Sequence, residues 1–262
     1  MVAPEAAYSG HVAMGDDESG SHGSSLPAAR SLEFSTTVGE TGGDGAAYPS
    51  KFEISPEDMQ HLRLLVERTG LVSVDVEDAM EVILNEAVDG ELDKESFNSC
   101  MRVLVVSDTL DEEEVRFFSR MLSGLFYAFD RDEKACVDAT ELACGFAVLC
   151  AGNKSAKLAA AWGLMDDDAD GLLTRRGLWR FLRSFLTALL AMSTAELTQA
   201  QLAATADHSA VWLSSHIFRV APCDHHSDLI SFDELAQWYT NGGHQVAAWL
   251  ELLDLSKWVT AE

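Results

Sequence analysis

The chain has 262 residues, of which 47% are hydrophobic, and a formal net charge of −25 at pH 7. This charge argues against nucleic acid and anionic membrane surfaces as partners, because their phosphates would be repelled. The five cysteines lack regular spacing, which favours reduced thiols over a disulfide framework. No apolar run reaches about 18 residues, and the beginning of the chain does not have the pattern of a signal peptide. We therefore expect a soluble, cytoplasmic protein without a transmembrane segment.

Residues 1–50 are rich in Gly, Ser, Ala and acidic residues and show little hydrophobic periodicity. Such a segment buries too little apolar surface to offset the entropy lost on ordering, so it is predicted to be a disordered acidic tail. Order is expected from Ile54 onward. The stretch Ser55-Pro56-Glu57-Asp58 combines an N-cap residue, a first-turn proline and first-turn acids, which together predict the start of a helix.

Apolar residues at helical spacing predict an all-α fold for the remainder of the chain. The predicted helices after the first one cover 75–84, 95–105, 111–129, 140–151, 154–165, 175–192, part of the stretch leading to Ala221, and 232–241. The last amphipathic segment, from His244 to Trp258, is expected to fold back as a helix over an apolar groove. Its apolar side chains would otherwise form an unusually large exposed patch.

One loop between these helices has the pattern of a calcium site. Calcium takes six to eight oxygen ligands, and a 12-residue loop supplies them from alternate side chains and one carbonyl, with glycine at the sixth position for a sharp turn. The candidate ligands are the side chains of Asp166, Asp168, Asp170 and Thr174 and the backbone carbonyl of Leu172. Gly177 stands where a bidentate Glu is usual. Affinity for Ca²⁺ is therefore expected below the sensor range of about 10⁻⁷–10⁻⁵ M, with Mg²⁺ as an alternative ion.

A second loop begins 36 residues earlier and fits the same template less completely. Its candidate ligands are Asp130, Asp132, Asp138 and Glu141. Lys134 places a cation where the fifth-position ligand belongs, and Ala135 replaces the turn glycine. Metal binding here would require the ammonium group to swing away and the turn to adopt a strained backbone.

Two further loops, beginning at Asn85 and Cys223, keep the template's outline but lack several of its chelating carboxylates: Asp89 and Gly90 fit the first loop and Glu234 fits the twelfth position of the fourth. In the fourth loop, Cys223, His225 and His226 allow a zinc reading, since thiolate and imidazole suit Zn²⁺, but a decayed calcium loop is the simpler interpretation. The eighth positions of the four loops are all apolar. Paired loops are therefore expected to share short β-bridges, Leu92 with Val137 and Leu173 with Ile230.

The stretch from Phe126 to Leu190 resembles the middle two hands of the neuronal calcium sensor and calcineurin B group of EF-hand proteins. The similarity rests on the Phe-Asp that opens the Asp130 loop, on Glu141-Leu142 with 145–149 after it, and on the helix 157–162. Outer-arm dynein calcium sensors belong to the same wider group. The resemblance implies two EF-hand lobes, here 51–152 and 153–262, and a hydrophobic groove that grips a partner's amphipathic helix.

No Ser-His-Asp set, phosphate-binding loop or pair of catalytic carboxylates stands out, so an enzyme is not expected. Two function classes remain. One is a calcium-responsive regulatory subunit, and the other is a constitutive, calcium-independent adaptor or structural subunit of a larger complex, for example a ciliary assembly. A stand-alone calcium buffer is disfavoured because only one loop is nearly intact. The loops favour the adaptor or a mixture of the two classes.

Overall fold

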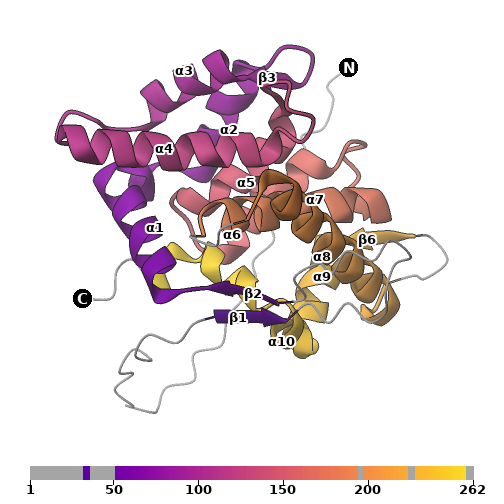
Figure 1. Cartoon of the computed structure of the whole chain (residues 1–262). Helices are drawn as coiled ribbons and strands as arrows, with labels where there is room; N and C mark the ends of the chain where they lie inside the picture. The colour runs from indigo at the N-terminus through magenta and orange to yellow at the C-terminus, as the bar shows by residue number, and fades with distance from the viewer. Residues whose placement is uncertain (1–31, 36–50, 194–196, 224–227, 258–262) are drawn as a thin grey trace, which may run out of the picture.

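The computed structural model describes residues 32–35, 51–193, 197–223 and 228–257, and these residues are predominantly helical (Figure 1). The predicted all-α fold is confirmed. The α-helices are α1 (Pro56–Arg68), α2 (Val76–Asn85), α3 (Lys94–Leu104), α4 (Glu112–Phe129), α5 (Ala139–Phe146), α6 (Lys154–Met165), α7 (Arg175–Ala191), α8 (Gln199–Val220), α9 (Phe232–Trp238) and α10 (His244–Val246). The 3₁₀ turns are η1 (Leu71–Ser73), η2 (Ala147–Leu149), η4 (Ala248–Leu253) and η5 (Leu255–Lys257), and η3 (Tyr239–Gly243) is a π-turn.

Short polar side chains define where the helices begin. Ser55 and Asp58 form a reciprocal capping box at α1, and Asp111 with Glu114 does the same at α4. These contacts satisfy backbone N–H groups that have no partner inside a helix. The chain turns out of α1 at Gly70, whose φ of 75° is readily adopted only without a Cβ.

The loop–loop bridges occur where the sequence predicts them. Strand β3 (Glu91–Asp93) pairs with β4 (Cys136–Asp138), and β5 (Leu172–Thr174) pairs with β6 (Leu229–Ser231), both antiparallel. Leu92 lies opposite Val137 and Leu173 opposite Ile230, and all four side chains are buried. Each bridge therefore joins two helix–loop–helix units and anchors their loops in the core.

A third sheet was not predicted. Strand β1 (Leu32–Ser35) pairs antiparallel with β2 (Lys51–Ile54), placing Leu32 opposite Ile54. The interpretation of 1–50 as a disordered tail is thus wrong for these four residues, and the rest of that segment lies outside the described residues. Local composition could not reveal the strand, because its partner lies at the start of the ordered chain.

Helix α7 lies in the middle of the molecule, packed against α4, α5, α6 and α8 (Figure 1). Its residues 181–190 are all buried, so the apolar side chains that surround its circumference all find neighbours. The buried core continues across residue 152, where the sequence suggested a boundary between two lobes. None of the described helices is long and apolar enough to cross a membrane.

The C-terminal segment folds back onto the molecule and packs against α6 and η2. Trp249, Leu250, Leu252, Leu253 and Leu255 are buried in this packing. The predicted single helix is wrong in detail, because the described part of the segment consists of α10 and two 3₁₀ turns. The backbone leaves the helical region at Ala247 (φ −119°, ψ 51°) and Asp254 (φ −87°, ψ 87°), so a regular helix is interrupted on both sides of η4.

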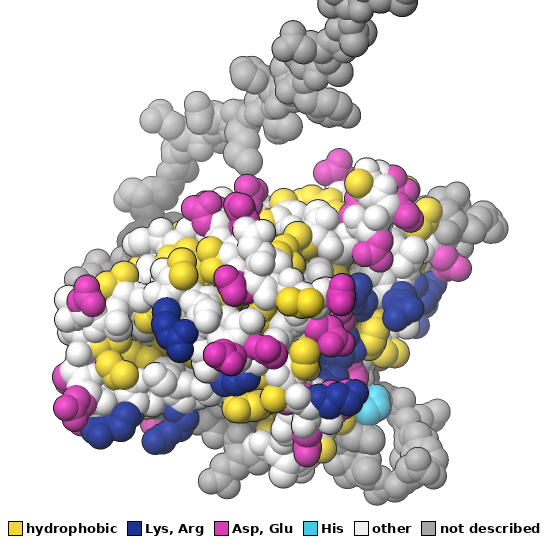
Figure 2. Space-filling view, turned by 90° about the horizontal axis from the view of Figure 1, so that it is seen from above, with side chains coloured by type: hydrophobic (Ala, Val, Ile, Leu, Met, Phe, Trp, Pro, Cys, Tyr) yellow, Lys and Arg dark blue, Asp and Glu magenta, His cyan; other side chains and the backbone are white. Residues whose placement is uncertain are grey.

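On the face shown in Figure 2, acidic, basic and hydrophobic side chains are interspersed. Several large hydrophobic side chains are exposed at the surface of the described residues. They are Leu64, Val88, Val103, Val106, Val115, Tyr127, Val211 and Val220. The surface therefore combines a strong overall negative charge with apolar positions available for contact with other molecules.

Candidate functional site

The Asp166 loop connects α6 to α7 through strand β5. Its first residue organises the turn, because the Asp166 carboxylate accepts the backbone N–H groups of Gly171 at 2.7 Å and Asp170 at 3.3 Å. Asp170 in turn accepts the N–H of Leu172 at 2.9 Å. Gly171 has a φ of 82°, as the template requires at its sixth position. The loop thus has a compact backbone with carboxylate oxygens close to its N–H groups.

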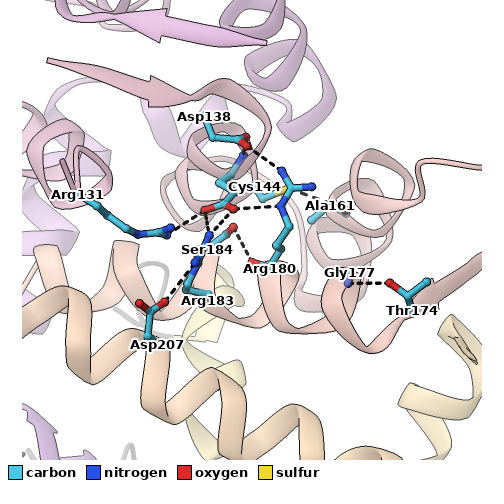
Figure 3. Close-up of polar contacts among 11 residues, drawn as sticks. Arg131, Asp138, Cys144, Ala161, Thr174, Gly177, Arg180, Arg183, Ser184 and Asp207 are labelled. Atoms are coloured by element: carbon cyan, nitrogen blue, oxygen red, sulfur yellow. Dashed lines mark hydrogen bonds and ion pairs between the residues drawn. The ribbon is translucent and has the colours of Figure 1, made fainter. Parts of the chain in front are cut away.

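The second half of this loop is tied to the helices on either side of it. Trp162 of α6 donates its indole N–H to the carbonyl of Gly171 at 3.2 Å. Thr174 caps α7 and accepts the N–H of Gly177 at 3.1 Å (Figure 3). A Cβ at Gly177 would lie 3.5 Å from atoms of Leu173 and Thr174, an ordinary contact distance. The twelfth position therefore has room for a larger side chain.

The Asp130 loop repeats the first of these features and then departs from it. Asp130 is buried and accepts the N–H groups of Lys134 at 2.9 Å and Ala135 at 2.8 Å. Glu133 and Ala135 have φ values of 57° and 56°, which is an unfavourable region for residues with a Cβ. The Lys134 ammonium pairs with Asp132 and, by this hydrogen bond, lowers the pKa of that carboxyl. Two of the four candidate ligands are thus engaged within the loop.

The other two candidates, Asp138 and Glu141, are held by arginines (Figure 3). Asp138 caps α5 with one carboxylate oxygen, and its other oxygen accepts a hydrogen bond from Arg180 at 2.8 Å. Glu141, only 4% exposed, accepts from Arg131 at 2.9 Å, from Nε of Arg180 at 3.0 Å and from Nη2 of Arg183 at 2.6 Å. We call Arg131, Arg180, Arg183 and Glu141 the arginine cluster.

Burial of Glu141 would raise the pKa of its carboxyl, but the hydrogen bond and charge of Arg183 outweigh burial and lower it. Arg183 is itself 5% exposed, lies 3.8 Å from the centre of the Trp179 ring, and also pairs with Asp207 of α8 at 3.2 Å. The cluster therefore links the Asp130 loop to α7 and α8. Glu141 occupies the twelfth position of the loop, whose carboxylate binds the ion in the calcium template. In this protein, arginine guanidinium groups pair with that carboxylate instead.

Sequence reasoning missed Arg180 and Arg183 as functional residues. The available signal was their spacing, three residues apart on a helix whose other buried positions carry no charge. A pair of arginines on such a face needs buried acidic partners, because an isolated charge in a core is very costly. The sequence alone did not identify Glu141 as that partner.

The first loop is closed as a β-turn. Val88 and Glu91 exchange backbone hydrogen bonds at 2.9 and 3.0 Å, and the two residues between them, Asp89 and Gly90, have φ values of 52° and 80°. Positive φ at both central positions is typical of a two-residue type I′ hairpin turn. Backbone hydrogen bonds therefore close the tip of this loop, and its strand β3 still pairs with β4.

The fourth loop is described only in part. Residues 224–227, including His225 and His226, lie outside the described residues, so the zinc alternative at Cys223 stays a prediction. After the gap, Asp228 pairs with Arg175 at 2.9 Å, and Arg175 also lies over the ring of Phe218 at 4.5 Å. Within the described parts of the chain, no group of three or more His, Cys, Asp or Glu residues is placed to hold a metal ion.

Comparison with known proteins found no match: no family model matches the chain, and no curated protein is significantly similar to it.

Proposed function

We propose that this protein is a divergent EF-hand protein of the neuronal calcium sensor and calcineurin B kind that acts as a non-enzymatic, helix-binding adaptor. The paired helix–loop–helix units, with bridges at Leu92/Val137 and Leu173/Ile230, support the EF-hand part of this proposal. Exposed apolar side chains support the binding part, because such positions provide contact area for a partner.

The arginine cluster is the observation that carries the adaptor function. In a responsive site, the twelfth-position carboxylate changes its partners when the cation arrives. Glu141 already has three cationic partners from within the chain, so its loop and α5 are held in place without metal. We infer that the shape presented to a partner by the Asp130 loop and α5 is constitutive.

A second candidate function, a calcium-responsive regulatory subunit, is favoured by the Asp166 loop. No ion pair holds Asp166, Asp168 or Asp170 within the described residues, and the Asp166–Gly171 and Asp170–Leu172 hydrogen bonds follow the template's turn. Ca²⁺ or Mg²⁺ bound there would engage Asp166, Asp168, Asp170, the Leu172 carbonyl and Thr174. This site would act on α7 directly, because Thr174 caps that helix.

Affinity capture with the full chain as bait separates the two functions. Capture is carried out in parallel with calcium and with a chelator, and the retained proteins are identified and quantified. A constitutive adaptor retains the same partner to a similar extent in both conditions. Retention only in calcium would contradict the adaptor function and favour the regulatory one.

A further inference from the structure

An apolar cleft lies between α2 and α6. It has a volume of about 460 Å³ and is lined by one face of each helix. Its lining residues are Glu77, Met80, Glu81, Leu84 and Asn85 of α2 and Ala159, Ala160, Gly163 and Leu164 of α6. The α2 residues follow the i, i+3, i+4, i+7 spacing of a single helical face. We call this surface the α2–α6 cleft.

The α6 side of the α2–α6 cleft has small residues, which leave room for close approach. Ala159 and Gly163 of α6 are exposed, and nothing lies within 4 Å of the position that a Cβ on Gly163 would occupy. Small residues on a helix surface let another helix backbone come close. Met80, Leu84 and Leu164 add larger apolar side chains to the walls. The shape therefore suits a second helix lying along the cleft.

The rim of the cleft selects the charge of its occupant. Glu77 and Glu81 are exposed on α2, one turn apart, and the only other polar lining residue is the uncharged Asn85. The protein's net charge of −25 adds a long-range attraction for cations. The residues 1–31 and 36–50 contain six acidic residues and one basic residue, so charge argues against these segments as occupants.

We propose that the α2–α6 cleft binds a basic amphipathic helix of a partner protein. The apolar stripe of the partner would lie on Ala159, Gly163 and Leu84, and its Lys or Arg residues would reach Glu77 and Glu81. This inference rests on the proposed adaptor function and adds to it the surface used and the chemistry of the partner.

The test uses the full chain and two synthetic, fluorescently labelled helical peptides of about 20 residues, long enough to span the cleft. Both carry the same Leu/Ala stripe, and their remaining positions are Lys in one peptide and Glu in the other. Fluorescence anisotropy at physiological salt should show binding of the Lys peptide and not of the Glu peptide. Equal binding of the two, or no binding of the Lys peptide, overturns the inference. The capture experiment decides the adaptor function separately.

Matched variants separate contact in the cleft from general charge attraction. Gly163→Leu fills the cleft without changing charge and should weaken binding of the Lys peptide about tenfold or more. Gly124→Leu is the control, because Gly124 is also an exposed glycine inside a helix with nothing within 4 Å of its Cβ position, but lies on α4. Circular dichroism should show both variants folded. If the two weaken binding equally, or neither does, the cleft is not the site.

A charge-swap pair completes the test. Glu81→Arg should weaken binding of the Lys peptide about fivefold, whereas Glu112→Arg on α4 makes the same change in net charge and should have little effect. If both swaps weaken binding equally, the attraction depends only on the net charge of the protein, and the inference is overturned. Sedimentation velocity identifies the remaining occupant, a second copy of the chain. A wild-type dimer that Gly163→Leu dissociates would also contradict the proposal.

Discussion

The Asp130 and Asp166 loops begin alike and end differently. In both, the first aspartate folds over its own loop and accepts the N–H groups four and five residues ahead. In the Asp130 loop, each later acidic candidate is paired with a cationic side chain, Lys134 or an arginine. In the Asp166 loop, no such pair holds Asp168 or Asp170 within the described residues, and the twelfth residue is Gly177.

The difference shows two ways to balance the charge of an acidic loop. The Asp130 loop takes positive charge from its own chain, and at Glu141 it does so in a buried setting. In the Asp166 loop, Asp166 and Asp170 accept backbone N–H groups, and no cationic side chain pairs with Asp166, Asp168 or Asp170 within the described residues. We propose that the Asp130 loop serves as a fixed structural joint and that the Asp166 loop keeps the ability to bind a cation.

Glu141→Ala should lower the free energy of unfolding by about 3–5 kcal/mol, because it leaves Arg183 buried without its main partner. Urea denaturation measures this change. Asp228→Ala is the control, since it removes an exposed ion pair with Arg175 and should cost at most about 1 kcal/mol. If the two substitutions cost the same, the arginine cluster is not a structural joint.

Gly177→Glu should bring the calcium affinity of the Asp166 loop into the range of about 10⁻⁷–10⁻⁵ M by supplying the missing bidentate ligand. Isothermal titration calorimetry measures this affinity. The new side chain also favours α7 without metal, because glutamate at N3 completes a capping box with Thr174.

Gly177→Ala controls for this effect on the helix. It should gain up to about 1 kcal/mol of stability from helix propensity and no calcium affinity. Equal calcium affinity in the two variants would mean that the Asp166 loop has lost its chelating shape.

In the Asp130 loop, the double variant Lys134→Asp/Ala135→Gly restores the template at the fifth and sixth positions. We expect no calcium binding by calorimetry, because Glu141 stays paired with its arginines. The single variant Ala135→Gly should raise stability by about 1 kcal/mol, since glycine adopts the positive φ at this position more readily. Micromolar calcium binding by the double variant would show that the arginine cluster yields to metal.

Glu251 is also held by cationic side chains, but it is more exposed than Glu141. Its substitution is therefore expected to change stability least. Its partial burial raises the pKa, but hydrogen bonds from Lys154, Lys257 and Tyr239 outweigh this and lower the pKa to about 2 from 4.5. A lowered carboxyl pKa adds stability above pH 4.5 that disappears as the pH falls toward 2. The difference in stability between wild type and Glu251→Gln should thus shrink across this window and stay below about 1 kcal/mol. A difference that grows on acidification would contradict this assignment.

Features set by local chemistry could be predicted from the sequence. Ser55 and Asp111 begin helices because each side chain accepts N–H groups of the first turn that follows it in sequence. The apolar eighth positions pair because paired loops are adjacent in space. The sequence also identified both acidic loops and the defects at Lys134 and Gly177.

The parts that could not be predicted depend on distant residues. Glu141 is 42 residues from Arg183, so the loop pattern alone could not show that its carboxylate turns toward α7. Strand β1 likewise needs a partner near residue 51. The C-terminal segment was correctly expected to fold back, but tertiary packing replaced its helix with 3₁₀ turns.

A calcium titration followed by two-dimensional ¹H–¹⁵N NMR tests the division between the loops most directly, because it reports on each backbone N–H separately. Calcium should shift the amide signals of Asp170, Gly171 and Leu172 and leave those of Lys134 and Ala135 in place. Shifts at Lys134 and Ala135 at the same calcium concentrations would show that the Asp130 loop binds the ion, which would contradict the role assigned to the arginine cluster.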